Sequence, residues 1–304
     1  MMYDVLIIGG GPAGLNAAMY AARKELKVGV IAELIGGQMT QTKDIDNYLG
    51  FPDVEAYELI QKMTDHAKKY PIDWITGRVD QLTRDEDGNY SAVTSDGETY
   101  RGQSAIIATG QRSRTLGIPG EEALTARGVS YCATCDGPFY RNKRVAIVGG
   151  GDSAVEAAIE MARIASEVHI LIRSRLRATE LLISKMQDTG KVKEWHHYIP
   201  IEIIGDKKVT ALKLKNTDTD EVVELPLDGV FVEIGGEPNN GFVPQELALN
   251  DNREVKVGRD TSTNLPGLFA AGDNTDYPQR QIVIAAADGA KAALAAHDYL
   301  LHKA

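Results

Sequence analysis

The chain has 304 residues, which is enough for one large domain or two of ordinary size. Hydrophobic residues make up 43% and charged residues 25%, as in globular proteins. A formal net charge of −10 argues against nucleic acid or an anionic membrane as the main partner. The sequence has no apolar run of about 18 residues and no signal-peptide pattern at its N-terminus, so we expect no membrane span and a cytoplasmic protein.

The first predicted elements are an apolar strand at residues 5–8, a glycine-rich turn, and an Ala-rich helix that ends near Arg23. The turn fits the G-x-G-x-x-G pattern with Gly9, Gly11 and Gly14. Such a turn lets a pyrophosphate approach the backbone, and the helix N-terminus favours its negative charge. Glu33, at the end of the second strand, has the place of an acid that binds an adenosine ribose. We predict a dinucleotide site here; the alternative is a tight glycine turn without a ligand.

Two further strands follow, at residues 90–94 and 98–101, with Asp96-Gly97 between them as a hairpin signal. A buried strand at residues 105–108 ends in Thr109-Gly110.

The only two cysteines come next, Cys132 and Cys135, with Asp136 directly after them. C-x-x-C is the spacing of redox motifs, in which one thiolate is stabilised and the other resolves a mixed disulfide. A zinc site needs four ligands and none of the six histidines is close in sequence, so we expect no metal. Two ordinary buried thiols are the remaining alternative. Asp136 is either a helix cap or an acid/base for the pair, and we favour the second.

A second glycine-rich turn, with Gly149, Gly151 and Ala154, fits G-x-G-x-x-A between strands at residues 145–148 and 168–172. No acid ends its second strand. Arg173, Arg175 and Arg177 stand there instead, where a 2′-phosphate would be bound. The alternative is a solvated basic turn.

Strands at residues 209–215, 221–225, 229–234 and 267–271 precede a C-terminal helix at residues 284–301. The repeated turn predicts an α/β fold with two Rossmann-like, three-layer ββα dinucleotide-binding domains, one inserted in the other. We expect one of these domains at residues 1–112 and 242–304, and the other, which carries the C-x-x-C, at residues 113–241. Two nucleotide sites and a dithiol suggest an electron relay from nicotinamide through flavin to a disulfide.

With these motifs the chain resembles the low-molecular-weight thioredoxin reductases, which are FAD-dependent pyridine nucleotide-disulphide oxidoreductases, over essentially its whole length. Residues 35–48 resemble that family's flavin-contacting loop, and residues 272–281 its second flavin clamp. The resemblance implies FAD contacts from Gly9, Gly11, Pro12, Ala13, Gly14, Glu33, Gly37, Gln38, Thr42, Asn47, Val79, Ala108, Thr109, Gly110, Gly272, Asp273, Arg280 and Gln281. It implies pyridine-nucleotide contacts from Gly149, Gly151, Asp152, Ser153, Ala154, Arg173 and Arg177.

The resemblance further implies catalysis by Cys132, Cys135 and Asp136, with Cys135 facing the flavin and Cys132 attacking a thioredoxin-like partner. It implies a homodimer, and a rotation of the inserted domain about hinges near residues 112 and 242 between half-reactions.

In that family, NADPH is recognised by a motif of His-Arg-Arg followed by three residues and a further Arg. This chain keeps only the spacing between two of the arginines, Arg173 and Arg177. Because no acid ends the strand at residues 168–172, the expected cofactors are FAD and NADPH. NADH is also possible, because residues 36–51 also resemble NADH-linked alkyl hydroperoxide reductases. Alternatives are a donor such as ferredoxin, another C-x-x-C partner such as one in a peroxiredoxin system, and a flavin redox sensor without turnover.

Overall fold

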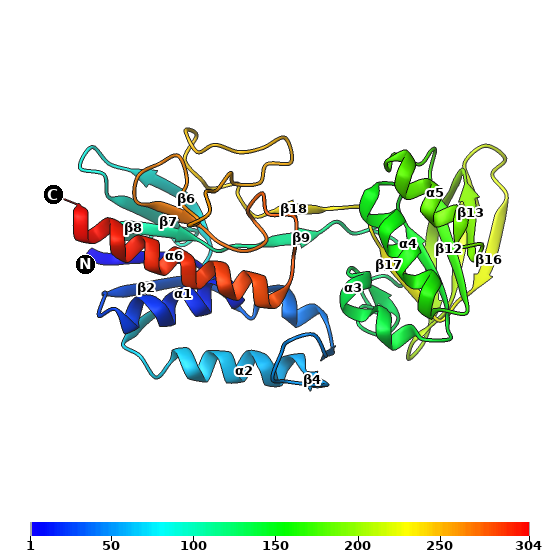
Figure 1. The fold of residues 1–304 in the computed structure, drawn as a ribbon, viewed down its shortest axis with the longest axis horizontal. Coiled ribbons are helices and arrows are strands. Elements are labelled where there is room, and N and C mark those ends of the chain that lie inside the picture. The colour runs from blue at the N-terminus through cyan, green and yellow to red at the C-terminus, as the bar shows by residue number, and fades with distance from the viewer. Residues whose placement is uncertain (1, 304) are drawn as a thin grey trace. The chain divides into compact units, whose positions relative to one another are not determined.

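A computed structural model describes residues 2–303. The chain divides into two compact units: a first unit of Met1–Arg112 with Glu237–Ala304, and a second of Ser113–Gly236 (Figure 1). The second unit is thus an insertion in the first. Two short strands, β9 (Gln111–Ser113) and β18 (Gly236–Pro238), pair where the chain passes between the units. Residues 237–241, which we expected in the inserted domain, group with the first unit, where Asn239 bonds to Thr109.

The first unit is built on a seven-stranded sheet in the order β5-β2-β1-β8-β7-β6, with β19 also paired to β8. Strands β1, β2, β5, β8 and β19 run parallel, whereas β7 pairs antiparallel with both β8 and β6. Strand β1 lies between two parallel neighbours and is buried on both faces, which explains its continuous apolar run. The bounds are β1 (Met2–Gly10), β2 (Val28–Ile35), β5 (Ile72–Thr76), β6 (Val79–Arg84), β7 (Tyr90–Thr94), β8 (Thr99–Ile107) and β19 (Leu268–Ala270).

Helices α1 (Pro12–Arg23) and α6 (Ile282–His302) cover one face of this sheet and pack closely on each other (Figure 1). A Cβ on Gly289 of α6 would lie only 2.0 Å from the carbonyl oxygen of Ala13 in α1, so this crossing requires glycine. The Asn16 side chain also donates to the carbonyl oxygen of Ala286 at 2.5 Å. This packing brings the C-terminal segment of the chain against the first glycine-rich turn. Helix α2 (Ala56–Ala67) and the short elements η1 (Gly37–Gln41), β3 (Asp44–Ile45) and β4 (Val54–Glu55) complete this unit.

The second unit has three layers: helices, a parallel sheet and an antiparallel sheet. The parallel sheet has five strands in the order β10-β17-β11-β12-β13, and the antiparallel sheet has the order β14-β15-β16. One apolar core lies between the helices and the parallel sheet and another between the two sheets. The bounds are β10 (Val129–Ser130), α3 (Ala133–Asp136), η2 (Gly137–Tyr140), β11 (Arg144–Val148), α4 (Asp152–Ile164), β12 (Glu167–Ile172), α5 (Glu180–Asp188), β13 (Val192–His196), β14 (Tyr198–Gly205), β15 (Val209–Asn216), β16 (Val222–Pro226) and β17 (Gly229–Val232).

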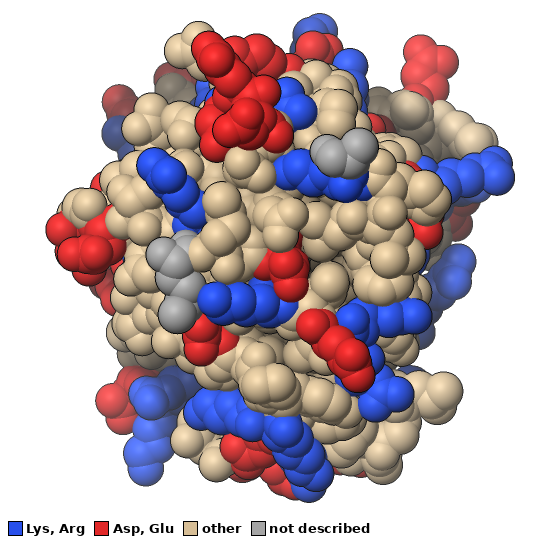
Figure 2. Space-filling model, turned by 90° about the vertical axis from the view of Figure 1, so that its left-hand side faces the viewer, with Lys and Arg blue, Asp and Glu red and all other residues tan. Residues whose placement is uncertain are grey.

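The predicted α/β class with two Rossmann-type units is confirmed. Within residues 2–303 no helix combines the length and apolar character needed to cross a membrane. No group of three or more potential metal ligands occurs in that part of the chain. On the face shown in Figure 2, Lys and Arg lie among Asp and Glu, so the described residues there form no continuous basic surface of the kind that binds nucleic acid.

Candidate functional site

The first glycine-rich loop joins β1 to α1 and fits the backbone tightly on one side. Gly9 has a φ of +120°, and a Cβ there would lie 2.2 Å from the carbonyl oxygen of Ala108. A Cβ on Gly14 would lie 2.0 Å from the carbonyl oxygen of Gly9. On the other side the loop is open, because the nearest atom to a Cβ on Gly11 is the Cα of Gly37 at 4.0 Å. Gly9 and Gly14 therefore serve packing, and Gly11 leaves room for a ligand.

The N-terminus of α1 is suited to bind a phosphate. Gly11 is its N-cap and no side chain caps it, and Pro12 occupies the first turn. The first N–H groups of a helix have no partner within the helix, and the helix dipole favours an anion there. A Cβ on Gly272 would lie 3.2 Å from the Cβ of the buried Ala13, so the predicted second clamp lies beside this helix start. The loop thus fits a dinucleotide pyrophosphate.

The predicted flavin-contacting loop follows β2 and reaches two distant segments of the first unit. Gly37 lies against Gly11, and Gln38 donates to the carbonyl oxygen of Gln111 at 2.5 Å. The side-chain amide of Asn47 donates to the side chain of Gln281 at 3.0 Å. Thr42, between them, directs its hydroxyl to the carbonyl oxygen of Asp44 at 3.5 Å. The structure therefore brings Asn47 and Gln281 together, as two predicted contacts of one ligand require.

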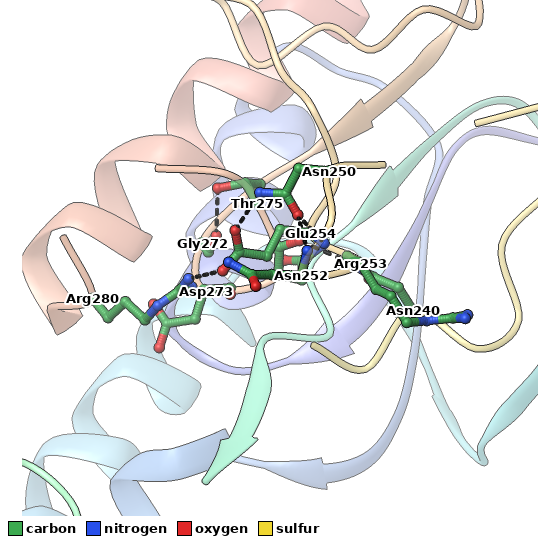
Figure 3. Close-up of polar contacts among 10 residues, drawn as sticks. Asn240, Asn250, Asn252, Arg253, Glu254, Gly272, Asp273, Thr275 and Arg280 are labelled. Carbon is green, nitrogen blue, oxygen red and sulfur yellow. Dashed lines mark hydrogen bonds and ion pairs between the residues drawn. The ribbon is translucent and has the colours of Figure 1, made fainter. Parts of the chain in front are cut away.

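The predicted second clamp is held by a polar network at the end of β19 (Figure 3). The Arg280 guanidinium donates to the carbonyl oxygen of Asp273 and forms an ion pair with Glu254. Burial raises the pKa of the Asp273 carboxyl, whereas Arg280 lowers it. The Thr275 hydroxyl donates to the carbonyl oxygen of Gly272 at 2.8 Å. Arg280 is thus fixed beside Asp273 by Glu254, a residue that our sequence reasoning missed.

Two buried asparagines, also missed, connect this clamp to the chain crossing. Asn240 donates to the carbonyl oxygens of Arg253 and Asn274, at 3.0 and 3.1 Å. Asn274 donates to the carbonyl oxygen of Ile107 at 3.2 Å. These hydrogen bonds from the asparagine side chains link the segment after β18 to the end of β8. No local sequence pattern indicates them.

The other predicted residues of the first unit lie around the ends of its parallel strands. Glu33 is exposed on β2 and lines a pocket of about 200 Å³ with Trp74 and Thr76. Val79 is buried at the start of β6. Thr109 exchanges hydrogen bonds with Asn239 at 3.0 Å, directly before Gly110, which has a φ of +61°.

The second glycine-rich loop joins β11 to α4 in the same manner. Gly149 has a φ of +153°, and its Cβ would lie 2.3 Å from the carbonyl oxygen of Glu233. A Cβ on Gly151 would have no atom within 4 Å. Gly151 is also the N-cap of α4, and no side chain caps that helix. Asp152 accepts from the N–H of Thr179 at 2.8 Å, Ser153 is exposed and Ala154 is buried. This loop, too, fits a pyrophosphate.

The arginine segment after β12 lies against this second loop. The N–H of Arg177 donates to the carbonyl oxygen of Gly150 at 2.6 Å. Arg173, Arg175 and Arg177 are all exposed, and none of them has an ion-pair partner among residues 2–303. Exposed guanidinium groups beside a phosphate-binding loop can accept a second phosphate.

The two cysteines form a disulfide at the start of α3, in the same unit as the second loop. Cys132 is the N-cap of α3, and its sulfur accepts from the N–H of Cys135 at 3.2 Å. Both cysteines are half-buried. Asp136 ends α3, and its side chain makes no cap bond to η2, so the structure gives the helix-cap interpretation of this carboxylate no support.

Two further carboxylates lie beside the disulfide and were missed by sequence reasoning. Glu233, directly after β17, accepts from the N–H of Ala133 at 3.1 Å. Glu160, on α4, accepts from the hydroxyl of Thr134 at 3.2 Å. Burial raises the pKa of Glu233 to about 7, against the opposing hydrogen bond from Ala133. Only the tertiary fold brings Glu233 to the pair, since its bond to Ala133 spans a sequence separation of 100 residues.

Solved structures of thioredoxin reductases share this fold. The chain superimposes on that from Streptococcus pyogenes MGAS5005 with a TM-score of 0.94 and 39% identity, covering 99% of this chain and 98% of the other. The thioredoxin reductase from Lactococcus lactis gives a TM-score of 0.67 at 39% identity, covering 98% and 99%.

Among curated proteins, the alkyl hydroperoxide reductase F protein from Pseudomonas putida is 40% identical over 303 residues, which are 98% of this chain and 58% of that protein. The corresponding F protein from Staphylococcus aureus (strain MRSA252) is 39% identical over 301 residues, 98% of this chain and 59% of that protein. The chain therefore spans less than two thirds of these relatives.

The sequence also matches the family described as pyridine nucleotide-disulphide oxidoreductase over residues 3–290. Because this match covers most of the chain, the protein belongs to the pyridine nucleotide-disulphide oxidoreductase family.

Proposed function

We propose that this protein is a thioredoxin-disulfide reductase that carries electrons from NADPH through FAD to the Cys132–Cys135 disulfide and then to thioredoxin or a thioredoxin-like protein. Family membership implies a flavin and a pyridine nucleotide. The observation that carries the proposal is the disulfide at the start of α3, in the same unit as an uncapped, open glycine-rich loop.

Residues 1–112 and 242–304 would hold FAD. The pyrophosphate would lie on the N-terminus of α1 at Gly11, and Glu33 would accept hydrogen bonds from the adenosine ribose. The flavin end would be held by Gln38 and Thr42 with Asn47 and Gln281, which already bond to each other, and by Asp273 and Arg280. When bound, the flavin accepts a hydride and returns two electrons to a disulfide.

The residues of the pair then have distinct tasks. Reduction breaks the S–S bond with two electrons, and two protons give two thiols. Cys132 attacks the partner disulfide as a thiolate, releasing one partner thiol and forming a mixed disulfide. Cys135 then breaks that bond, which restores the Cys132–Cys135 disulfide and releases the second partner thiol. We assign Asp136 to move protons to and from the pair. We further propose that the second unit, residues 113–236, rotates between half-reactions.

For the electron donor we favour NADPH over NADH. The dinucleotide would bind on the N-terminus of α4 at Gly151, with Asp152, Ser153 and Ala154 in the first turn. Arg173 and Arg177 are exposed beside that loop and would bind the 2′-phosphate. NADH as sole donor, or a donor such as ferredoxin, remains the alternative within this proposal.

For the partner, the similarity to the alkyl hydroperoxide reductase F proteins favours a second candidate: a C-x-x-C protein that passes electrons to a peroxide-reducing protein. We further propose a cytoplasmic location, since a redox pair that is reduced in each cycle suits a reducing compartment. The resemblance to thioredoxin reductases is the ground for proposing a homodimer. A monomer by light scattering at micromolar concentration would contradict the dimer.

Stopped-flow reduction of the bound flavin by NADPH and by NADH tests the electron donor. Insulin reduction through thioredoxin tests electron transfer from the Cys132–Cys135 pair to the partner protein. We expect fast bleaching by NADPH and sustained turnover that Cys132→Ser abolishes. Bleaching by neither nucleotide would overturn the nucleotide-driven reaction. No sustained turnover would favour a flavin redox sensor, and turnover that Cys132→Ser leaves unchanged would overturn the role of the disulfide in passing electrons to the partner.

A further inference from the structure

Glu233 connects the second glycine-rich loop to the helix that carries the disulfide. Its N–H donates to the carbonyl oxygen of Val148 at 2.8 Å, and its own carbonyl oxygen lies 2.3 Å from where a Cβ of Gly149 would be. Its side chain extends to the other side, to the N–H of Ala133 at 3.1 Å. One residue therefore contacts both the nucleotide loop and the first residue of α3.

The first unit shows that the fold does not need a carboxylate at this position. Ala108 is the equivalent residue there: its N–H donates to the carbonyl oxygen of Ile8 at 2.8 Å, and its carbonyl oxygen lies 2.2 Å from where a Cβ of Gly9 would be. The same backbone contacts are made by alanine in one unit and by glutamate in the other. The Glu233 side chain therefore has a task beyond supporting the loop.

The task follows from the donors at the start of α3. The N–H of Cys135 donates to the sulfur of Cys132, whereas the N–H of Ala133 donates to Glu233. A backbone N–H that points at a cysteine sulfur stabilises its thiolate form, and a nearby negative charge opposes it. The carboxylate of Glu233 on the N–H of Ala133 adds a negative charge one peptide away from Cys132.

The groups that face Glu233 do not neutralise it. Glu160 on α4 has the same sign and opposes its ionisation, and Asp136 on α3 belongs to the same helix as Ala133. Within residues 2–303, no Lys, Arg or His forms an ion pair with Glu233. The charge of this carboxylate therefore acts on the neighbouring sulfur without a counter-ion between them.

We propose that Glu233 is a positioning residue that binds the start of α3 and, when ionised, favours the protonated thiol of Cys132 over the thiolate. The inference rests on the proposed redox role of the pair. Because Glu233 and Cys132 would each oppose the other's ionisation, the two groups titrate as a coupled pair. Glu233 would then retain protons on the reduced dithiol until a partner disulfide is in place.

The test uses the full-length flavoprotein with Cys135→Ser, which leaves Cys132 as the only thiol. Alkylation of Cys132 by iodoacetamide is followed from pH 5 to pH 10, with and without Glu233→Gln. Gln retains the volume and an oxygen that accepts from Ala133, but has no charge. With Glu233, we expect the alkylation rate to rise over a broad pH range. With Gln, we expect the rate to rise in a single step at lower pH, so that the variant has roughly tenfold more Cys132 thiolate at neutral pH.

Glu160→Gln in the same background is the matched control, since Glu160 bonds to a side-chain hydroxyl and not to the backbone of α3. We expect it to move the profile less than Glu233→Gln does. A Glu233→Gln profile that superimposes on that of its Cys135→Ser parent would overturn the proposal.

If Glu233→Gln does not fold, the wild-type protein labelled with carbon-13 at glutamate carboxyls gives the answer. Coupling is reciprocal, so thiolate formation on reduction by dithiothreitol must move the titration of one glutamate to higher pH. If reduction changes the titration of none of the labelled glutamates, the coupling is refuted. Neither measurement involves NADPH or thioredoxin, so failure of the proposed reaction and failure of this inference remain separate results.

Discussion

The two glycine-rich loops have the same backbone and different surroundings. At the first, the loop after β2 and the segment before α6 both come against the start of α1, and Ala13 in its first turn is buried. At the second, the equivalent residue Ser153 is exposed, and the neighbouring arginine segment is exposed as well. A site contacted from several segments suits a cofactor that stays bound, whereas an open site suits a nucleotide that leaves in each cycle. The predictions that follow test this difference.

Cys132→Ser should separate the two sites most strongly. Reduction of a protein disulfide should fall at least about a thousandfold, because the attacking thiolate is gone. Reduction of the flavin by NADPH should continue, because neither glycine-rich loop is altered. Insulin reduction through thioredoxin and bleaching of the flavin measure the two steps independently. Loss of both steps would mean that the disulfide is also needed for flavin reduction.

Gly14→Ala should damage the first loop, because a Cβ there would lie 2.0 Å from the carbonyl oxygen of Gly9. We expect a loss of about 3 kcal/mol in the free energy of unfolding, and loss of flavin from the purified protein. Thermal unfolding and the flavin-to-protein absorbance ratio measure these effects.

The second loop provides the matched control for that change, because its equivalent residue is Ala154. Ala154→Gly should cost only about 1 kcal/mol, the ordinary effect of glycine in a helix. Equal effects at Gly14 and Ala154 would contradict the difference in packing between the loops.

Glu233→Gln should change how stability depends on pH in the oxidised protein. The Glu233 carboxyl has a pKa of about 7 in the folded protein, above its ordinary value of 4.5. The folded state therefore binds this proton more tightly than the unfolded chain, and ionisation reduces stability as pH rises through this range. The difference in free energy of unfolding between Glu233→Gln and the wild type should therefore change by about 2–3 kcal/mol, in favour of the variant, from pH 4 to pH 8.

Urea unfolding of both proteins across this pH range measures the difference. A difference that is constant with pH would show that the carboxyl is solvated and ionises normally. Because Ala108 holds the equivalent place in the first unit, this pH dependence belongs to the second unit alone.

Arg173→Ala should have the smallest effect. We expect KM for NADPH to rise about tenfold, or about 1.4 kcal/mol in binding, with KM for NADH unchanged. Steady-state kinetics with both nucleotides measure this. Arg163→Ala, which removes an exposed arginine from the last turn of α4, is the control and should leave both values unchanged. Equal changes for NADPH and NADH would show that Arg173 does not bind a 2′-phosphate.

Local patterns predicted the elements that have strong local signals. The hairpin at Asp96-Gly97 appears as the antiparallel pair of β7 and β8, and Gly97 has the positive φ that its turn requires. The C-terminal helix begins and ends within two residues of the predicted bounds. The strand β5 and the helix α5 were not predicted, because few of their residues are buried and the apolar pattern is weak. The helix α2 was also not predicted, although its buried residues Ala56, Leu59, Ile60 and Ala67 have helical spacing.

The sequence alone determined the two glycine-rich loops and the redox pair, because each depends on a short motif whose residues are close together in the chain. The repeat of the glycine-rich turn also predicted the inserted arrangement. Only the tertiary structure decided which distant residues meet. It paired Asn47 with Gln281, Arg280 with Glu254, and Glu233 with the backbone of Ala133. These contacts depend on how strands and helices pack across the chain, and packing leaves no signal in local spacing. The most specific inference, about the carboxylate beside the disulfide, therefore came from the fold.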